Sequence, residues 1–476
     1  LDGNYPVGTG NVALGDTALD DGSLSGGYNT AIGNEALTAN TSGSVNVAVG
    51  QGTLYLNTTG QSNVAVGGNA MADNTTGNYN TAIGRYALAD NNTGSESTAV
   101  GYQAGYSNTT GRITAMGRHA VKNNTTAVEV TGIGYRALRD NTTGQFNTSV
   151  GGDALMQNTT ASNNTAVGYQ SLYSNTTGVD NTAVGDIALR GNTTGGNNVA
   201  VGRYAGYSGA TSNYGVFVGA QAGFNVTGDN NTAVGYQAIN NGACTGANNT
   251  AVGYQALYDN TIGAQNTSVG FRSLYNNTTA SNNTALGQDA LYTNTTGANN
   301  VALGHSALVS NTTASNNTAV GYQSLTANTT GTGNAAVGVQ SLVANTTGSG
   351  NSAFGSFHVG VQYAPLRSNT TGGSNSAFGV GSLQANTSAS NNSAFGVNSL
   401  ANNTTGAQNT GIGMYALANN TTASDNFAGG YNALGANTTG SNNVGIGHRA
   451  LQANTTASNN TAVGYKAGYA NTTGTL

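Results

Sequence analysis

The chain has 476 residues, of which only 6% are charged, and its formal net charge is −5. Ordinary domains carry about 25% charged residues, so this surface differs from that of a typical globular protein. The sequence contains no basic run that would follow a phosphate backbone and no apolar stretch of about 18 residues. These features argue against nucleic acid as a partner and against insertion into a membrane.

The first ten residues, which include Pro6, are expected to form an N-terminal lead-in or cap. From residue 11 to residue 476 the sequence predicts one continuous repeat array. A glycine recurs from Gly15 to Gly464 in 27 copies, and 21 of the 26 intervals are 17 residues long. A unit this short must stack on its neighbours to bury a core. We therefore expect an all-β fold, a parallel β-solenoid or β-roll of about 27 stacked 17-residue coils.

The consensus unit reads Asn-Thr-Ala-Val-Gly-Tyr-Gln-Ala-Leu-Tyr-Ser-Asn-Thr-Thr-Gly-Ser-Asn, and we number its positions one to seventeen from the first Asn. Residues 164–180 are a typical copy. Position four is apolar in every copy but one, and position nine is mostly Leu. Two apolar anchors five residues apart favour two short strands separated by a bend at the glycine of position five. Positions four and nine are therefore expected to line the interior.

The side chains at positions two and four compensate for each other in size. Position two is Ser352 where position four is Phe354, and it is Phe427 where position four is Gly429. Volume-conserving exchange indicates that the two positions share one space, which we place in the core. Four glycines also replace the Leu of position nine, each followed by an aromatic residue whose ring is expected to cover the hole: Gly105, Gly206, Gly223 and Gly468.

Position three lies between these two positions and is almost always Ala. Alternation along a strand then predicts that it points outward and forms a smooth face suited to another chain. The other interpretation is that a small residue is simply exposed there. The candidate inter-chain residues are Ala48, Ala65, Ala166, Ala183 and Ala200.

The second half of the unit carries Asn-Thr-Thr, usually followed by Gly. Asn and Gly tolerate left-handed backbone angles, so this segment is expected to be the corner of each coil. Stacked coils would align the Asn side chains in a hydrogen-bonded ladder. The same residues match the Asn-X-Thr acceptor for glycosylation. The candidates for either role are Asn57, Asn74, Asn108, Asn141, Asn175, Asn294, Asn328 and Asn437.

Three further features depart from the consensus repeat. In residues 209–224 the corner motif is missing, and Phe217 at position three is expected to present a different outer face. The single cysteine, Cys244, is interpreted as a small corner residue, with an interchain bridge as the alternative. An insertion at residues 356–362 is expected to form a loop that either contacts a partner or packs back on the coils. Its candidate contact residues are Phe357, His358 and Val359.

Residues that could carry chemistry are few and scattered. Four histidines fall in different coils without a neighbouring Cys or carboxylate at metal-ligand spacing: His119, His305, His358 and His448. Asp153, Asp186 and Asp289 occur singly at positions six and seven, where a solvated role is expected. None of these three carboxylates is paired with another acid on an adjacent coil, as in polysaccharide-cleaving solenoids, and the sequence lacks a phosphate-binding loop. We therefore expect no catalytic residue, no cofactor and no metal.

The phrase Asn-Val-Ala-Val-Gly at residues 46–50, 63–67 and 198–202 resembles the head repeat of YadA-like trimeric autotransporter adhesins. The repeat is also similar to those of phage tail fibres and microbial surface proteins. In that family the repeat builds a left-handed parallel β-roll, three of which pack side by side and attach cells to surfaces. The resemblance implies a location outside the cell, at the cell surface or on a virion fibre. It also implies self-association as a parallel trimer or filament, with surface glycans or a host receptor as further partners.

Repeat, composition and resemblance together predict an extracellular structural fibre or filament subunit, an adhesin-like shaft without catalytic activity. The alternative is a binding module for a periodic ligand, such as ice or a polysaccharide, recognised through ladders of Thr and Asn. That alternative requires Thr side chains that point outward, whereas position two is expected to point inward.

Overall fold

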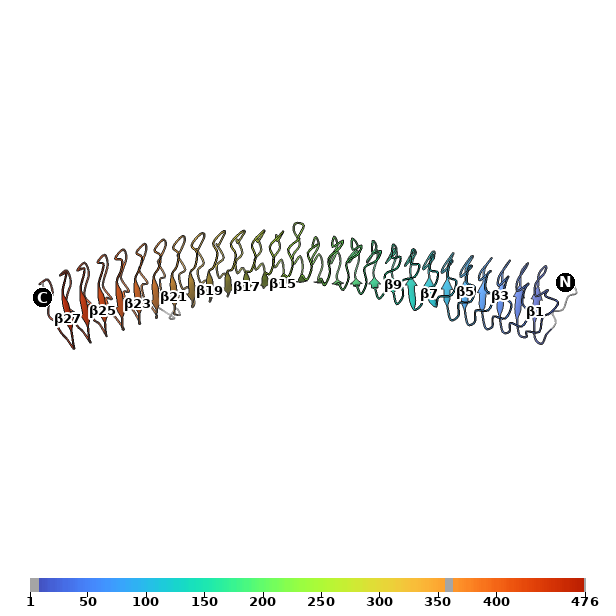
Figure 1. The fold of residues 1–476 in the computed structure, drawn as a ribbon, viewed down its shortest axis with the longest axis horizontal. Coiled ribbons are helices and arrows are strands. Elements are labelled where there is room, and N and C mark those ends of the chain that lie inside the picture. Colours follow the sequence, from blue (N-terminus) through green and yellow to red (C-terminus); the bar gives the residue numbers. More distant parts are fainter. Residues whose placement is uncertain (1–7, 356–362, 475–476) are drawn as a thin grey trace. The chain divides into compact units, whose positions relative to one another are not determined.

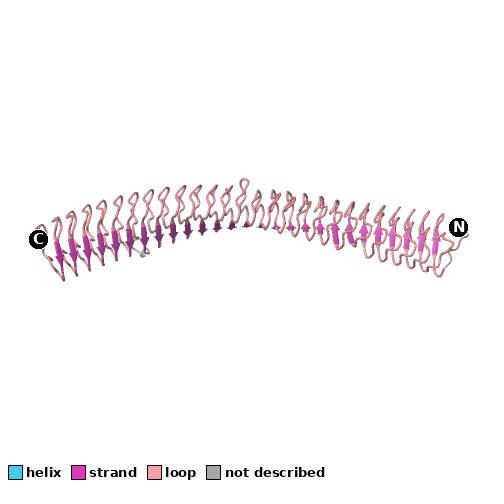
Figure 2. Cartoon of the chain, in the orientation of Figure 1, coloured by secondary structure: helices cyan, strands magenta, loops and turns pink. Residues whose placement is uncertain are grey.

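The computed structural model describes residues 8–355 and 363–474, which contain strands and turns but no helix. They belong to two compact units, Leu1–Val234 and Gly235–Leu476, each of which is described by itself. Within each unit, every repeat forms one coil, and its single short strand lies beside the strand of the next coil (Figure 1, Figure 2). The expected all-β parallel solenoid is therefore confirmed in both units.

The described residues of the first unit form fourteen strands, which pair in parallel with their neighbours in chain order. They are β1 Val12–Leu14, β2 Thr30–Ile32, β3 Val47–Val49, β4 Val64–Val66, β5 Thr81–Ile83, β6 Thr98–Val100, β7 Ile113–Met116, β8 Val130–Ile133, β9 Thr148–Val150, β10 Thr165–Val167, β11 Thr182–Val184, β12 Val199–Val201, β13 Val216–Val218 and β14 Thr232–Val234.

In the second unit, the part of the chain that the structure describes forms thirteen strands that pair in the same way. They are β15 Thr250–Val252, β16 Thr267–Val269, β17 Thr284–Leu286, β18 Val301–Leu303, β19 Thr318–Val320, β20 Ala335–Val337, β21 Ser352–Phe354, β22 Ser376–Phe378, β23 Ser393–Phe395, β24 Thr410–Ile412, β25 Phe427–Gly429, β26 Val444–Ile446 and β27 Thr461–Val463.

The strands stack in register, so each repeat position lies opposite the same position of the next coil. In β10 and β11, for example, Ala166 pairs with Ala183. The glycine of position five ends each strand. Gly168 has a φ of 131°, and a Cβ there would collide with the carbonyl oxygen of Gly185 in the next coil. Backbone angle and close stacking together explain why this glycine recurs.

The second half of each coil is not the second strand that the sequence predicted. Gln170 and Leu172 both have a φ of 51°, in the left-handed region, so the chain turns repeatedly instead of extending. The turns are still tied to the next coil, because the Leu172 amide donates to the Ala188 carbonyl at 2.9 Å. Only the first half of the coil therefore contributes to the sheet.

The core of each coil is built from positions three, eight and nine. Position nine is inward as expected, and Leu172 is fully buried. The assignment of positions three and four was wrong, because the two are exchanged. Val167 at position four is 36% exposed. All five proposed inter-chain alanines are fully buried inside their own chain: Ala48, Ala65, Ala166, Ala183 and Ala200.

The physical reason for this exchange is the narrow interior of a 17-residue coil. Position three packs directly against the position-nine side chain of the preceding coil. Where position three is Gly445, an added Cβ would already lie 3.2 Å from Cγ of Leu434. An Ala fits opposite a Leu in this space, whereas a Val or Ile on the same side would overfill it. The larger strand residues therefore point outward.

Positions two and four do share one face, but it is the outer one. The Phe427 ring is 37% exposed, and an added Cβ at Gly429 would lie 3.4 Å from its edge. Phe354 stacks on Phe378 with ring centroids 4.8 Å apart, again on the outside. The size compensation seen in the sequence is thus real, but it maintains an outer surface and not the core.

The space beside two of the four glycines at position nine, Gly206 and Gly223, is filled differently from the sequence prediction. Phe217, expected to face outward, is fully buried. Its ring occupies the space next to Gly206 and Gly223, where the Leu of position nine is missing. The neighbouring Tyr207 and Phe224 instead stack on each other at 4.9 Å and are only half-buried. A large residue at position three thus replaces two missing leucines.

Two expected features lie wholly or partly outside the described residues. The insertion at residues 356–362, with Phe357, His358 and Val359, lies outside the described residues. Of the expected lead-in, only residues 8–10 are described, and the Thr9 carbonyl accepts a hydrogen bond from the Tyr28 amide at 2.8 Å. The left-handedness implied by the family resemblance stays a prediction.

Candidate binding surfaces

The corner asparagines at position twelve form a buried ladder. The Nδ2 group of Asn175 donates to Oδ1 of Asn158 at 3.1 Å and to the Gly178 carbonyl at 2.9 Å. Asn192 repeats the pattern by donating to Oδ1 of Asn175 at 2.8 Å. The other seven candidates are fully buried and bonded in the same way: Asn57, Asn74, Asn108, Asn141, Asn294, Asn328 and Asn437.

This geometry favours the structural role of these eight residues over glycosylation. A glycan replaces a hydrogen on Nδ2, and the Nδ2 groups are fully buried and donate hydrogen bonds to neighbouring oxygens. In the folded coil no space remains for a sugar. The ladder also cannot contact an external ligand, so the Asn part of the periodic-ligand alternative was wrong.

Position one carries a second buried ladder that the sequence analysis missed. Oδ1 of Asn164 accepts the backbone amide of Asn181 at 3.0 Å, and Nδ2 of Asn181 donates to the Gly195 carbonyl at 2.9 Å. The available signal was the recurrence of Asn immediately before each strand. Burial of an amide is favourable only when its donors and acceptor are bonded, and this arrangement provides those bonds.

Cys244 is part of the same corner structure. The thiol is buried, and its sulfur accepts a hydrogen bond from Nδ2 of Asn260 at 3.3 Å, where a ladder Asn would normally offer an oxygen. Burial raises the pKa of this thiol, while the contacts to Asn260 and Gly246 oppose the shift. Its position agrees with the interpretation as a small corner residue.

The side chains at positions two and four of the strands form what we call the outer sheet face of each unit. In all 27 strands these positions hold only Val, Thr, Ile, Leu, Met, Phe, Ser, Ala or Gly, without a charged residue. Val184 and Val201 are 37% and 39% exposed. Because the register is constant, each unit presents two parallel rows of small and apolar side chains. Thr at position two lies on this face and not in the core.

Aromatic residues form ladders outside the sheet face. At position six, Tyr236, Tyr254 and Phe271 stack with centroid distances of 5.5 and 5.1 Å. At position ten, Tyr258 and Tyr275 stack at 5.0 Å, and Tyr292 extends this ladder. Stacking of this kind adds to the stability of neighbouring coils by about 0.5–1.5 kcal/mol per pair.

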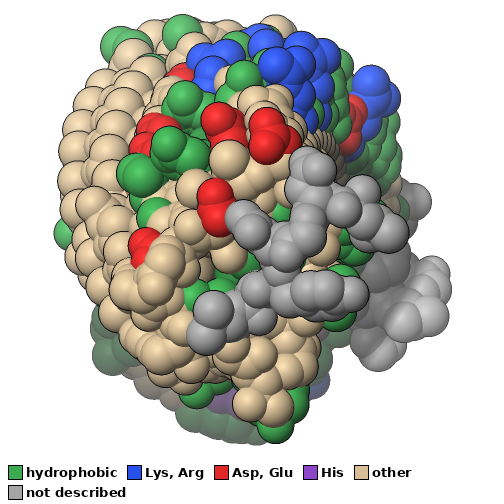
Figure 3. All heavy atoms as spheres, turned by 90° about the vertical axis from the view of Figure 1, so that its right-hand side faces the viewer, with side chains coloured by type: hydrophobic (Ala, Val, Ile, Leu, Met, Phe, Trp, Pro, Cys, Tyr) green, Lys and Arg blue, Asp and Glu red, His purple; other side chains and the backbone are tan. Residues whose placement is uncertain are grey.

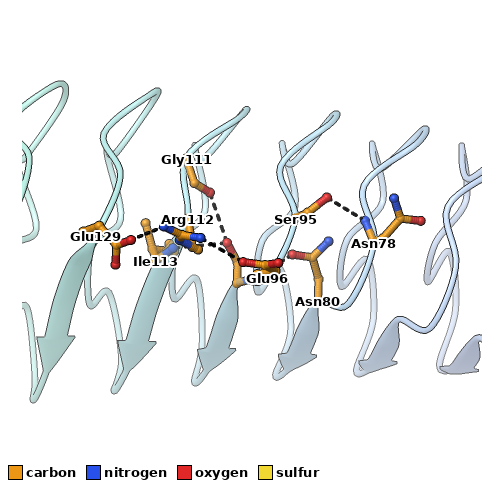
Figure 4. A network of polar contacts seen from close by, with 9 residues as sticks. Asn78, Asn80, Ser95, Glu96, Gly111, Arg112, Ile113 and Glu129 are labelled. Atoms are coloured by element: carbon orange, nitrogen blue, oxygen red, sulfur yellow. Dashed lines mark hydrogen bonds and ion pairs between the residues drawn. The ribbon is translucent and has the colours of Figure 1, made fainter.

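The charged residues lie at the turns and partly neutralise one another. Arg112 contacts Glu96 of the preceding coil and Glu129 of the following coil, an alternation of charge at position seventeen (Figure 4). These side chains are about half exposed, so the pairs add little stability. Lys and Arg side chains also gather on one side of the view in Figure 3.

The first unit contains a local cluster of basic residues that the composition does not reveal. Burial, and then the charges of Lys122 and Arg118, lower the pKa of His119. Within the cluster, Arg136 is paired with Asp153 at 2.7 Å, and Arg139 is paired with Asp140 at 2.7 Å. These carboxylates reduce the net positive charge of the patch.

The scattered titratable residues that the structure describes do not come together in a metal-binding group. Within residues 8–355 and 363–474, no three His, Cys, Asp or Glu side chains lie close enough together to hold a metal ion. The same part of the chain contains no helix capable of crossing a membrane. The surfaces that remain as candidates are the outer sheet faces, the aromatic ladders and a groove described below.

Comparison with known proteins provides no assignment. No model of a protein family matches the sequence, and no curated protein is significantly similar to it. Arguments about function therefore depend on the surfaces themselves.

Proposed function

We propose that the chain is a structural subunit of an extracellular fibre or filament, a non-catalytic adhesin-like shaft whose copies associate in parallel through their outer sheet faces. The observation that carries the proposal is the composition of that face, which is uncharged along every strand of both units. Contiguous exposed apolar surface of this kind is rare on monomers and typical of contacts between proteins.

The regular spacing of the face favours a second copy of the same chain as its occupant. Rows in one unit repeat at the spacing of parallel strands, about 4.8 Å, and a parallel copy presents rows with the same spacing. Such matching allows symmetric packing, as is usual for homo-oligomers. The extracellular location and the parallel trimer or filament are taken from the resemblance to adhesin heads and are part of the proposal.

The test places charge on the outer sheet face without touching the core. Val167→Lys combined with Val184→Lys adds two like charges to neighbouring strands and should shift the assembly to monomers, because unpaired charges are costly at a buried contact. The matched control, Thr177→Lys with Thr194→Lys, adds the same charges to exposed turn residues of the same two coils. Sedimentation velocity at micromolar concentration should show assembly for the wild type and the control only. A folded, monomeric wild type would contradict the proposal.

The periodic-ligand alternative keeps one observation in its favour. Position two is Thr in each strand from β5 to β11, and it lies on the outer sheet face. Replacing Thr131, Thr148 and Thr165 with Val preserves shape and removes the hydroxyls. Under this alternative, binding to ice or to a crystalline polysaccharide would disappear. Under the shaft proposal, self-association would persist or increase.

A further inference from the structure

The second unit contains a groove of about 440 Å³ on the turns of its coils. It is lined by Tyr363, Asn398, Tyr415, Asn419, Tyr431 and Asn432, together with small residues at its floor. These side chains belong mainly to positions six, seven and eleven, outside the outer sheet face. The groove is therefore separate from the surface proposed for self-association.

The groove exists because three successive coils carry small residues at position ten. Ala401, Ala418 and Gly435 occupy that position, whereas Tyr258 and Tyr275 fill it with stacked rings elsewhere in the same unit. The loss of three neighbouring side chains leaves a hollow that extends along the stack of coils. A ligand in this hollow would run from coil to coil.

The walls of the groove are aromatic. Tyr415 and Tyr431 meet edge to face with centroids 6.3 Å apart, and Tyr431 is 39% exposed. Tyr rings offer both an apolar face and a hydroxyl, a combination suited to ligands that are polar at their rims and apolar on their flat sides.

A chain of amides runs along the groove, above these small residues. Nδ2 of Asn402 donates to Oδ1 of Asn419 at 3.1 Å, and Nδ2 of Asn419 donates to the Gly435 carbonyl at 2.9 Å. Oδ1 of Asn398 is buried and accepts no hydrogen bond from the residues that the structure describes. This oxygen lies against Gly381 of the preceding coil, so the exposed amides of Asn402 and Asn419 are the groups that a ligand hydroxyl can reach.

We propose that this groove binds a neutral oligosaccharide along the direction in which the coils stack. Its lining residues carry no formal charge, which disfavours phosphates and other strongly charged ligands. Amides pair with sugar hydroxyls as donors and acceptors, and tyrosine rings cover the C–H faces of pyranose rings. The inference deepens the adhesive part of the proposed function, but it requires neither self-association nor a particular location.

The test uses soluble oligosaccharides of glucose, N-acetylglucosamine and mannose, with an oligomer of glucuronic acid as the charged comparison, in isothermal titration calorimetry. Ala418→Tyr should fill the groove, because Tyr already occupies position ten in other coils, and should weaken binding at least about tenfold. The matched control, Val309→Tyr, adds the same ring at position ten outside the groove. It should bind like the wild type.

Three outcomes would overturn the inference: no binding of any neutral oligosaccharide, equal binding by Ala418→Tyr, or binding of the glucuronic acid oligomer alone. Sedimentation of Ala418→Tyr separates this question from that of assembly. If this variant associates normally and has lost sugar binding, the groove is supported. If the wild type binds sugar but remains monomeric, the shaft proposal alone fails.

Discussion

At the residue scale, the most important side chain of the repeat is asparagine. Two Asn per coil are buried, at positions one and twelve, and both bond to a neighbouring Asn as well as to the backbone in typical coils. Asp would supply the acceptor oxygen of Asn, and Ser would match its small size. Neither residue supplies the two N–H donors of the Asn side chain. This explains why the corner sequence recurs so regularly in a chain with few charges.

Replacing Asn175 with Asp tests this role while preserving shape. The carboxylate would face Oδ1 of Asn158 and the Gly178 carbonyl, which both accept bonds in the wild type. We expect local destabilisation of about 3 kcal/mol or more, because buried acceptors would lose their donors. Hydrogen exchange of the Thr176 amide, bonded to the Thr193 carbonyl at 2.9 Å, should accelerate accordingly. Exchange unchanged from that of a variant at the exposed Thr177 would contradict the ladder's importance.

Cys244 predicts a pH dependence of known sign. Its pKa is raised by burial, so the folded coil favours the neutral thiol more than the unfolded chain does. The resulting stability is fully present below about pH 8.5, the ordinary thiol pKa, and is lost as the pH rises through the higher folded value. Thermal unfolding of the second unit should show this loss, and Cys244→Ala should lack it. A wild type and variant with parallel pH profiles would disprove the effect.

At the scale of the strand and its coil, the sequence revealed the period but not which side faces inward. Period-two alternation correctly grouped positions two and four, as the pair Phe427 and Gly429 shows. The pattern is the same, however, whichever face is buried. What decides the matter is the space opposite position nine, where Leu434 leaves room for little more than a Cβ. The width of the coil interior depends on how the chain folds in three dimensions, and it cannot be predicted from the repeat length alone.

The conformation of the second half of the coil and the presence of the groove could not be predicted from the sequence either, for different reasons. Leu172 adopts a left-handed conformation that residues other than glycine seldom adopt, so the spacing of the apolar positions predicted a strand that does not form. Ala401, Ala418 and Gly435 are unremarkable singly, and they create a groove only because stacking places them side by side. Neither feature can be inferred from a single 17-residue repeat considered alone.

Neighbouring coils should show strong coupling at Phe217. Gly223→Leu restores the consensus at position nine but places a side chain where the Phe217 ring lies. It should therefore destabilise the first unit. Phe217→Ala should also destabilise this unit, by about 3–5 kcal/mol, because the buried ring is lost. The double variant should recover most of this loss, because a Leu refills the cavity. A double-mutant cycle by chemical unfolding measures the coupling, and additive effects would show that the two side chains do not share one space.

At the scale of the whole molecule, low charge and uncharged outer sheet faces predict how assembly responds to salt. An apolar contact is little affected by the screening that sodium chloride provides, and it is strengthened by sulfate, which is excluded from protein surfaces. The wild type should therefore associate more tightly in sodium sulfate and almost equally across sodium chloride concentrations. Sedimentation equilibrium gives both comparisons. Dissociation by sodium chloride would indicate that charged turns, such as those around Arg112, hold the copies together.

The constant register described for β9, β10 and β11 has a consequence for how such a protein changes length. Deleting residues 164–180 removes one whole coil and brings Thr148 opposite Thr182, the same pairing of like with like that each strand already makes. Asn158 would then meet Asn192, and the ladder would close without a gap. Each repeat thus adds one strand to the stack, which lengthens it by about 4.8 Å. Recombination between repeats could therefore shorten or lengthen the chain by whole coils, while the remaining coils keep the same strand pairing and the same Asn ladder.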